Sequence, residues 1–202
     1  MERRAVMAEQ LINGQVIDAC QQGDREAFRS LFEAYKDKVF SIAVYSSGGD
    51  RTVAEDVTQQ IFLKLFTAIR QFRGESEFTT WLYRLVVNAC LDERRRRRRL
   101  LSFDTTPTTR MTVAMSDVSD KKPQERQYAR LEISEAVRKA IAELKPKFRL
   151  PILLKYIEGL SYEEIARVMG CSKGTVASRL NRGHSQLAKR LSHLNNPALW
   201  GE

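Results

Sequence analysis

The chain has 202 residues, 43% of them hydrophobic and 29% charged, with a formal net charge of +9. This composition predicts one or two globular domains of the cytoplasm, because no stretch is long and apolar enough for a membrane span or a secretory signal. Three distant cysteines and two histidines form neither a disulfide framework nor a zinc-binding spacing, so no metal or cofactor is expected. We expect the cysteines to be reduced and buried, and a redox role stays open.

The first half of the chain shows helical periodicity. Apolar residues recur at helical spacing from about Asp24, over 53–69 and over 78–89. Glycines at 48 and 49 mark one of the intervening loops. Three amphipathic helices of this kind predict a small bundle.

The third of these helices ends in six consecutive arginines, residues 94–99. The helix dipole explains two or three basic residues at a C-terminus, so six favour phosphate binding over a localisation or solubility run. Upstream, the spacing puts Trp81 on the core face. Four residues fall on the other faces: Tyr83, Arg84, Val87 and Asn88. Aromatic residues beside arginines are typical of sites that bind unpaired bases.

Residues 102–124 have no helical apolar period and are rich in Thr, Ser and Asp. They predict a flexible linker between two domains, 1–101 and 125–202. The second domain begins with two further helices, over 125–144 and 146–158. The expected fold is all-α, with two small helical domains of which the second ends in a helix-turn-helix.

That helix-turn-helix lies at residues 160–180. Ser161 and Glu164 have the spacing of a capping box, Gly170 permits a sharp turn, and Ser172 caps the next helix. The outward face of this second helix can reach base edges and phosphates in a major groove. Its candidates are Ser172, Lys173, Thr175, Ser178, Arg179 and Arg182. These features in register favour a DNA reader over an ordinary helical hairpin with a solvated basic face.

Three motifs, in this order, closely resemble the extracytoplasmic-function sigma factors of bacteria. They are Ala-Glu-Asp-Val-Thr-Gln-Gln-Ile-Phe-Leu-Lys-Leu-Phe (54–66), Phe-Arg-Gly-Glu-Ser-Glu-Phe-Thr-Thr-Trp-Leu-Tyr-Arg-Leu-Val-Val-Asn (72–88), and Gly-Leu-Ser-Tyr-Glu-Glu-Ile-Ala with Gly-Thr-Val-Ala-Ser-Arg-Leu (159–166 and 174–180). The resemblance covers about 16–193. It implies a transcription initiation subunit, not an enzyme, that brings RNA polymerase to a promoter.

The resemblance also implies roles for individual residues. Segment 54–66 would contact the clamp coiled coil of core RNA polymerase through Asp56, Gln59, Gln60 and Lys64. The helix from Ser172 would read the minus-thirty-five element, and a loop at 72–77 with Asn88 would take a flipped base of the minus-ten element. The residues expected in minus-ten recognition and melting are Phe72, Arg73, Trp81, Tyr83, Arg84, Asn88, Arg94, Arg95 and Arg96. Residues 148–154 would meet the polymerase flap.

Members of this family are usually held inactive by an anti-sigma factor, so such a partner is expected, in some cases at the inner face of the membrane, for a stress or envelope response. Two other interpretations stay open. A stand-alone helix-turn-helix regulator would need neither segment 54–66 nor a base-flipping helix. An RNA-binding or nucleoid protein would show weak sequence preference and a steep salt dependence.

Overall fold

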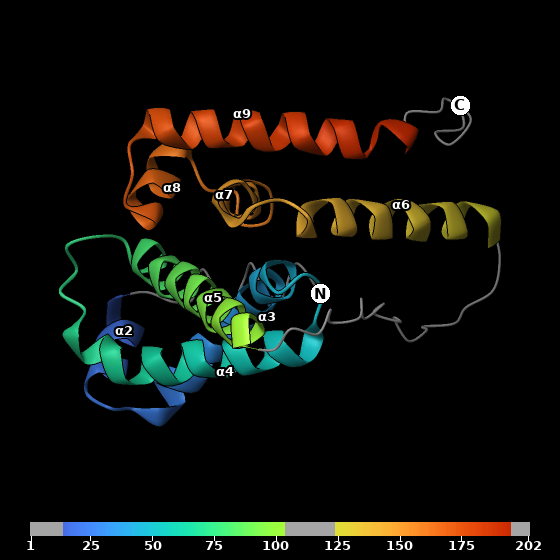
Figure 1. Cartoon of the computed structure of the whole chain (residues 1–202). Coiled ribbons are helices and arrows are strands. Elements are labelled where there is room, and N and C mark those ends of the chain that lie inside the picture. Colours follow the sequence, from blue (N-terminus) through green and yellow to red (C-terminus); the bar gives the residue numbers. More distant parts are fainter. Residues whose placement is uncertain (1–13, 104–123, 195–202) are drawn as a thin grey trace.

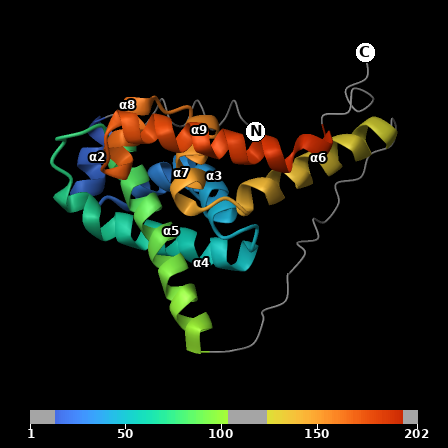
Figure 2. The ribbon, with the colours of Figure 1, turned by 45° about the horizontal axis from the view of Figure 1, so that its top comes forward.

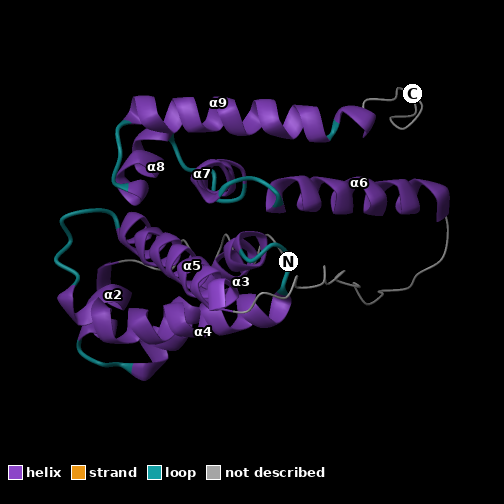
Figure 3. Cartoon of the chain, in the orientation of Figure 1, coloured by secondary structure: helices purple, strands orange, loops and turns teal. Residues whose placement is uncertain are grey.

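The computed structural model describes residues 14–103 and 124–194. These ranges contain α-helices and two short 3-10 turns without any strand, which confirms the all-α prediction (Figure 3). The first helical group consists of α2 (Gly14–Gln21), α3 (Arg25–Ser46), α4 (Arg51–Ala68) and α5 (Phe78–Phe103). The second helical group consists of α6 (Gln124–Ala142), α7 (Pro146–Tyr156), α8 (Tyr162–Met169) and α9 (Lys173–Arg190).

Side-chain caps set the helix starts in the first group. The Asp24 carboxylate accepts from the backbone N–H groups of Glu26 and Ala27, and α3 begins there as predicted. Helix α2, which the periodicity did not predict, holds the loop after α4. The Gln21 side-chain amide donates to the carbonyl oxygens of Ile69 and Phe72, at 3.2 and 2.6 Å. Phe72 therefore has a fixed backbone position.

The predicted helix-turn-helix forms as expected. Ser161 Oγ accepts from the Glu164 N–H at 3.2 Å while the Glu164 carboxylate accepts from the Ser161 N–H at 2.7 Å. Gly170 ends α8 with φ +60°, a left-handed conformation that favours glycine. Ser172 Oγ then accepts from the Thr175 N–H at 3.2 Å and starts α9. Local sequence alone accounts for this unit.

Helices α7 and α9 cross closely at Gly183. A Cβ atom placed on Gly183 would lie 2.6 Å from Ile152 Cδ1, inside the buried core. We expect Gly183→Val to lower the free energy of unfolding by about 1–3 kcal/mol, because overpacking forces the helices apart. Gly174→Val is the control, since the nearest atom to its Cβ is 3.9 Å away. Thermal unfolding followed by circular dichroism measures the difference, and equal losses in the two variants would contradict the close crossing.

The two helical groups pack on each other (Figures 1 and 2). Helices α6 and α7 lie against α3, and α8 lies against α5. The buried apolar residues of both groups form one continuous cluster. Helix α5 is consequently covered on two sides, by α3 and α4 on one and by α8 on the other.

Candidate nucleic-acid and polymerase interfaces

Helix α9 presents the predicted DNA-reading residues along its outer side. Ser172, Lys173, Ser178 and Arg182 are exposed, and Thr175 is half-buried. The Lys173 ammonium forms an ion pair with Glu163 of α8.

Two arginines of α9 differ in their surroundings. Arg179 is half-buried, with Nη1 3.7 Å from Cys171 Sγ. Arg182 forms no hydrogen bond or ion pair within the described ranges. Of the two side chains, Arg182 is therefore the freer to contact DNA.

The start of α5 carries an aromatic cluster. The rings of Phe72, Phe78 and Trp81 pack with centroids 5.2 to 5.9 Å apart. Trp81 was expected on the core face but is only partly buried. It is followed at helical spacing by the exposed Arg84 and Asn88, so the three side chains share one face. We call these three residues the α5 stripe. It combines a partly exposed ring, a cation and an amide, the groups that bind an unpaired base.

Arg73 lies in the loop before α5, beside the aromatic cluster. Its side chain is 83% exposed, with Nη1 4.0 Å from the Glu75 carboxylate. An exposed pair at this distance contributes little to stability, so the guanidinium can move to a phosphate.

Tyr83 and Val87 are not where the spacing predicted them. Both were expected on outward faces, but they are only 1% and 3% exposed. The Tyr83 hydroxyl donates to the Glu158 carboxylate of the second helical group. The prediction was wrong because helical periodicity marks apolar faces without showing that α8 covers a second side of α5. In this arrangement Tyr83 cannot touch DNA.

The arginine run is partly neutralised by acids of its own helix and of α4. Arg95 pairs with Asp92 at 3.4 Å and Arg96 with Glu93 at 2.8 Å. The run also contributes a tertiary contact, because Arg97 pairs at 2.9 Å with Asp50, the residue that caps α4. The exposed Arg95–Asp92 pair contributes about 0–1 kcal/mol, so a phosphate can displace it. Glu93 is only 10% exposed and pairs with both Arg96 and Arg97, so Arg96 is held more firmly.

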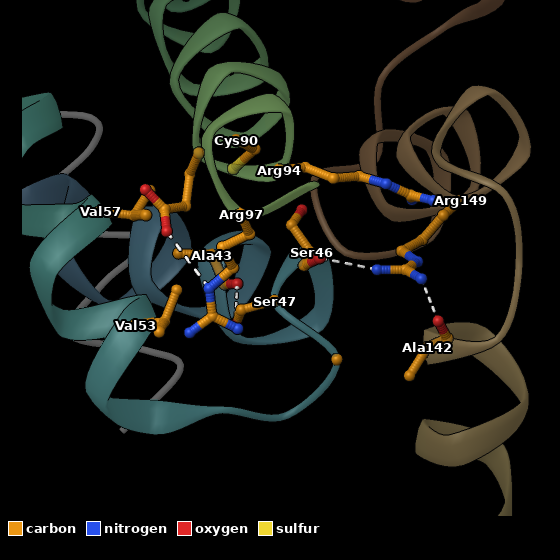
Figure 4. A pocket seen from close by; sticks show the side chains of 12 residues that line it. Ala43, Ser46, Ser47, Val53, Val57, Cys90, Arg94, Arg97, Ala142 and Arg149 are labelled. Carbon is orange, nitrogen blue, oxygen red and sulfur yellow. Dashed lines mark hydrogen bonds and ion pairs between the residues drawn. The ribbon is translucent and has the colours of Figure 1, made fainter. Parts of the chain in front are cut away.

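Arg94 points instead toward Arg149 of α7, at a cavity of about 240 Å³ between the helical groups (Figure 4).

The outer face of α4 carries the predicted polymerase contacts. Asp56, Gln59, Gln60 and Lys64 are all exposed. Beside them lies a groove of about 770 Å³ between α3 and α4 that sequence reasoning missed. Its apolar lining consists of Phe28, Phe32, Phe40, Phe62, Leu63 and Phe66.

Two large apolar side chains at this α3–α4 groove are exposed to solvent, Leu63 by 61% and Phe66 by 43%. The sequence signal was a surplus of aromatic residues on α3 and α4 beyond what one core-facing stripe needs.

Comparison with known proteins agrees with this architecture. The family model described as Sigma-70 region 2 matches residues 31–100, and that described as Sigma-70, region 4 matches residues 134–187. The ECF RNA polymerase sigma factor SigW of Bacillus subtilis is 33% identical over 180 residues, which are 88% of this chain and 96% of that protein. The chain belongs to the ECF sigma factors. The ECF RNA polymerase sigma-E factor of Escherichia coli K12 is 34% identical over 194 residues, 93% of this chain and 98% of that protein.

Solved structures share the fold of this sigma factor. CnrH in complex with the cytosolic domain of CnrY matches with a TM-score of 0.62 and 25% identity, over 88% of this chain and 96% of that one. The sigma factor RpoE of Bartonella quintana, in complex with the anti-sigma factor NepR, matches with a TM-score of 0.65 and 23% identity, over 82% and 96% of the two chains. The family consists of transcription initiation factors that bind RNA polymerase and promoter DNA. None of the described helices has the length and apolar character needed to cross a bilayer.

One expectation for the polymerase flap is not met. Residues 148–154 of the sigma factor are all buried, because α7 packs against α3, α8 and α9. The apolar side chains exposed near this point follow them, with Tyr156 65% and Ile157 38% exposed. A segment whose side chains are buried on every side belongs to the core. A flap contact at this end of the domain would use Tyr156 and Ile157.

Arg182→Ala is expected to weaken binding of duplex promoter DNA by about 1–3 kcal/mol if the side chain contacts a guanine in both acceptor positions. Lys189→Ala removes an equal charge near the other end of α9 and is expected to weaken DNA binding less than Arg182→Ala does. Fluorescence anisotropy with duplex promoter DNA at fixed salt gives both values. Equal losses would mean that Arg182 contributes charge alone.

The three cysteines are free, and Cys20 and Cys90 are buried. Burial raises the pKa of the Cys90 thiol to about 11. Since the thiolate is the reactive form, we expect the buried Cys90 at pH 8 to be alkylated much more slowly than the half-exposed Cys171, with the Cys90 rate rising toward pH 11. Mass spectrometry of iodoacetamide-treated protein measures this, and similar rates would contradict a protonated, buried thiol.

Proposed function

We propose that the two helical groups of this sigma factor have different functions in transcription initiation. Residues 1–101 would bind core polymerase and open the minus-ten element, and residues 125–202 would read the minus-thirty-five element, with 102–124 connecting them. The observation that carries the proposal is that one chain holds three separate surfaces: a capped recognition helix, the α5 stripe and the exposed side of α4 with its groove.

The α5 stripe supports base capture next to the point of melting. Trp81 is held in place by Phe72 and Phe78, so its ring is a fixed surface for stacking. Asn88 lies two turns further along with an exposed amide that can hydrogen-bond a base edge. Extruding a base costs a few kcal/mol, which these contacts would offset. Arg95 and Arg96 would hold the backbone.

The α3–α4 groove supports a helical partner on core polymerase. Polar residues on α4, among them Glu55 and Gln59, border an apolar trough containing Phe62 and Phe66. An amphipathic helix placed there would bury its apolar face in the trough and pair its polar residues with the rim. This geometry fits the clamp coiled coil better than a contact by four polar residues alone.

We further propose that an anti-sigma factor controls the chain. RpoE of Bartonella quintana, which shares this fold, was solved with the anti-sigma factor NepR. The exposed apolar residues Leu63 and Phe66 offer such a partner a surface that polymerase also needs. The site of action would be the cytoplasm, with membrane attachment arising only through the anti-sigma factor. A stress or envelope response is the expected setting.

The test mixes the purified chain with bacterial core RNA polymerase. We expect comigration on size exclusion and specific transcripts from genomic fragments, including the region upstream of its own gene. Phe66→Asp should abolish comigration, whereas Thr67→Asp, its exposed neighbour outside the groove lining, should reduce it less. Binding of promoter DNA without any polymerase association would support a stand-alone regulator instead.

A further inference from the structure

We propose that the cavity between the helical groups is a binding site for a small oxyanion of the phosphate class, which Arg94 of α5 and Arg149 of α7 hold between them. Residues of α3, α4, α5, α6 and α7 line this cavity of about 240 Å³. Among its lining residues only Arg94 was expected to contact promoter DNA, and none was expected to contact polymerase. The site therefore lies beyond the proposed function and does not depend on it.

Arg149 is a fixed, buried cation at this cavity, with 6% of the residue exposed. Its Nη1 donates to the carbonyl oxygens of Tyr45 and Ser46, at 3.1 and 2.7 Å, at the C-terminal end of α3. Its Nη2 donates to the carbonyl oxygens of Ala142 and Leu144, at the end of α6. All four partners are neutral, and Nε is buried without a hydrogen-bond partner among the described residues. The guanidinium is therefore held in place while its charge and one N–H group remain available to an anion.

Arg94 supplies a second positive charge, and its side chain points toward Arg149 (Figure 4). Within the described ranges Arg94 forms no hydrogen bond or ion pair, and the neighbouring Glu93 carboxylate pairs with Arg96 and Arg97 instead. Burial and the like charge of Arg94 lower the pKa of Arg149 to about 10. Two guanidinium groups that face each other repel, and an anion between them replaces the repulsion with two attractions.

The Ser46 hydroxyl adds an uncharged donor from α3. Ser46 lines the cavity, and its Oγ is buried without a hydrogen-bond partner among the described residues. The neighbouring Cys90 thiol is a weak hydrogen-bonding group, and burial raises its pKa to about 11, so it carries no charge at neutral pH. Buried donors without an acceptor oppose folding. One oxyanion would satisfy the Ser46 hydroxyl and Arg149 Nε together.

The volume and the charge of the lining favour a small polyvalent oxyanion. About 240 Å³ holds a phosphate ion with a few waters, each of which occupies roughly 30 Å³ in the liquid. It leaves little room for the sugars on either side of a nucleic-acid phosphate. The lining contains three arginines and one acid, Glu93. Four tetrahedral oxygens can accept at the same time from guanidinium groups of α5 and α7 and from a hydroxyl of α3, whereas a halide presents a single atom.

Isothermal titration calorimetry with inorganic phosphate tests the site in the whole chain, with potassium chloride keeping the ionic strength constant. We expect saturable binding of one phosphate per chain. Because phosphate binds the folded chain, the midpoint of thermal unfolding should also rise with phosphate concentration. Sulfate should act in the same way, and chloride should not. Wild-type protein without saturable phosphate binding would overturn the site.

Arg94→Gln removes one of the two charges and should weaken phosphate binding about tenfold or more. Arg98→Gln is the matched control, since it removes the same charge from an exposed residue one turn further along α5 and outside the cavity lining. It should change the affinity by less than about threefold. Ser46→Ala removes the hydroxyl without changing the charge and should weaken binding several-fold.

Two patterns among these variants would contradict the site. Equal losses in Arg94→Gln and Arg98→Gln would mean that the arginine run attracts phosphate by its total charge. An unchanged affinity in both Arg94→Gln and Ser46→Ala would mean that the ion binds elsewhere. Either pattern overturns the proposal.

Cys90 reports where the ion binds. It lines the cavity, whereas Cys171 lies in the turn between α8 and α9, outside the lining. A phosphate ion in the cavity stabilises the protonated thiol and blocks access to it, so phosphate should slow the alkylation of Cys90 at mildly alkaline pH and leave Cys171 unchanged. Mass spectrometry after iodoacetamide treatment gives both rates. Equal slowing of both cysteines, or of neither, would overturn the proposal.

Nucleic acid is the other source of the same chemistry, and competition separates the two. A single-stranded oligonucleotide without terminal phosphates should leave the phosphate affinity unchanged. Displacement of phosphate by the oligonucleotide would assign Arg94 to the DNA backbone and overturn a small-ion site. All of these measurements use the free chain, so a failure to join core polymerase would overturn the proposed function without affecting the phosphate site.

Discussion

Replacing Arg149 with methionine is expected to lower the free energy of unfolding by about 3 kcal/mol or more. The methionine fills a similar volume but leaves four carbonyl oxygens without the donor that they share. Burial and the neighbouring Arg94 lower the pKa of Arg149 to about 10, so the guanidinium still carries its charge at neutral pH. Urea unfolding followed by circular dichroism gives the free energy.

Two further variants identify the origin of this loss. Lys147→Met changes an exposed cation on the same helix and should cost less than about 0.5 kcal/mol. Arg149→Lys keeps the charge without the planar fork, so it should lie between methionine and wild type. If the methionine variant were as stable as wild type, Arg149 would not be holding the two helix ends.

Asn88→Ala is expected to reduce promoter opening by about tenfold or more while binding to core polymerase stays unchanged. The exposed Asn88 amide belongs to the α5 stripe. Asn88 does not line the α3–α4 groove, so its loss should not affect a partner bound there. Loss of its hydrogen bonds would leave the cost of extruding the base uncompensated. Permanganate reactivity of unpaired thymines in the holoenzyme complex measures opening directly.

Gln15→Ala is the matched control for this experiment, because it removes an exposed amide from α2, away from the stripe. It should open promoters like wild type. Normal permanganate reactivity in Asn88→Ala would remove Asn88 from the base pocket, and a loss of polymerase binding would assign it to a different surface.

Local sequence was sufficient wherever neighbouring residues alone decide the conformation. The capping box of Ser161 and Glu164, the left-handed Gly170 and the cap at Ser172 all formed as predicted. Each depends on hydrogen bonds or φ angles within four residues, so no other part of the chain can change them. The Asp24 cap belongs to the same class.

The arginine run shows a signal that was present but unused. Asp92 and Glu93 stand three residues before Arg95 and Arg96, the spacing of an ion pair on a helix. The pairing with Asp50 of α4 has no such signal, because it joins residues 47 positions apart. Six arginines in sequence are therefore not six free cations in the fold.

By itself the sequence determined the all-α class and the helix-turn-helix, which follow from periodicity and caps, and the family, which follows from its motifs. Only the tertiary structure decided that Tyr83 and Val87 are buried, that 148–154 is core, and that aromatic residues of α3 and α4 leave an open groove. The physical reason is that periodicity counts the apolar faces of a helix without naming what covers them. Helix α5 is packed on one side by α3 and α4 and on another side by α8, which belongs to the second helical group.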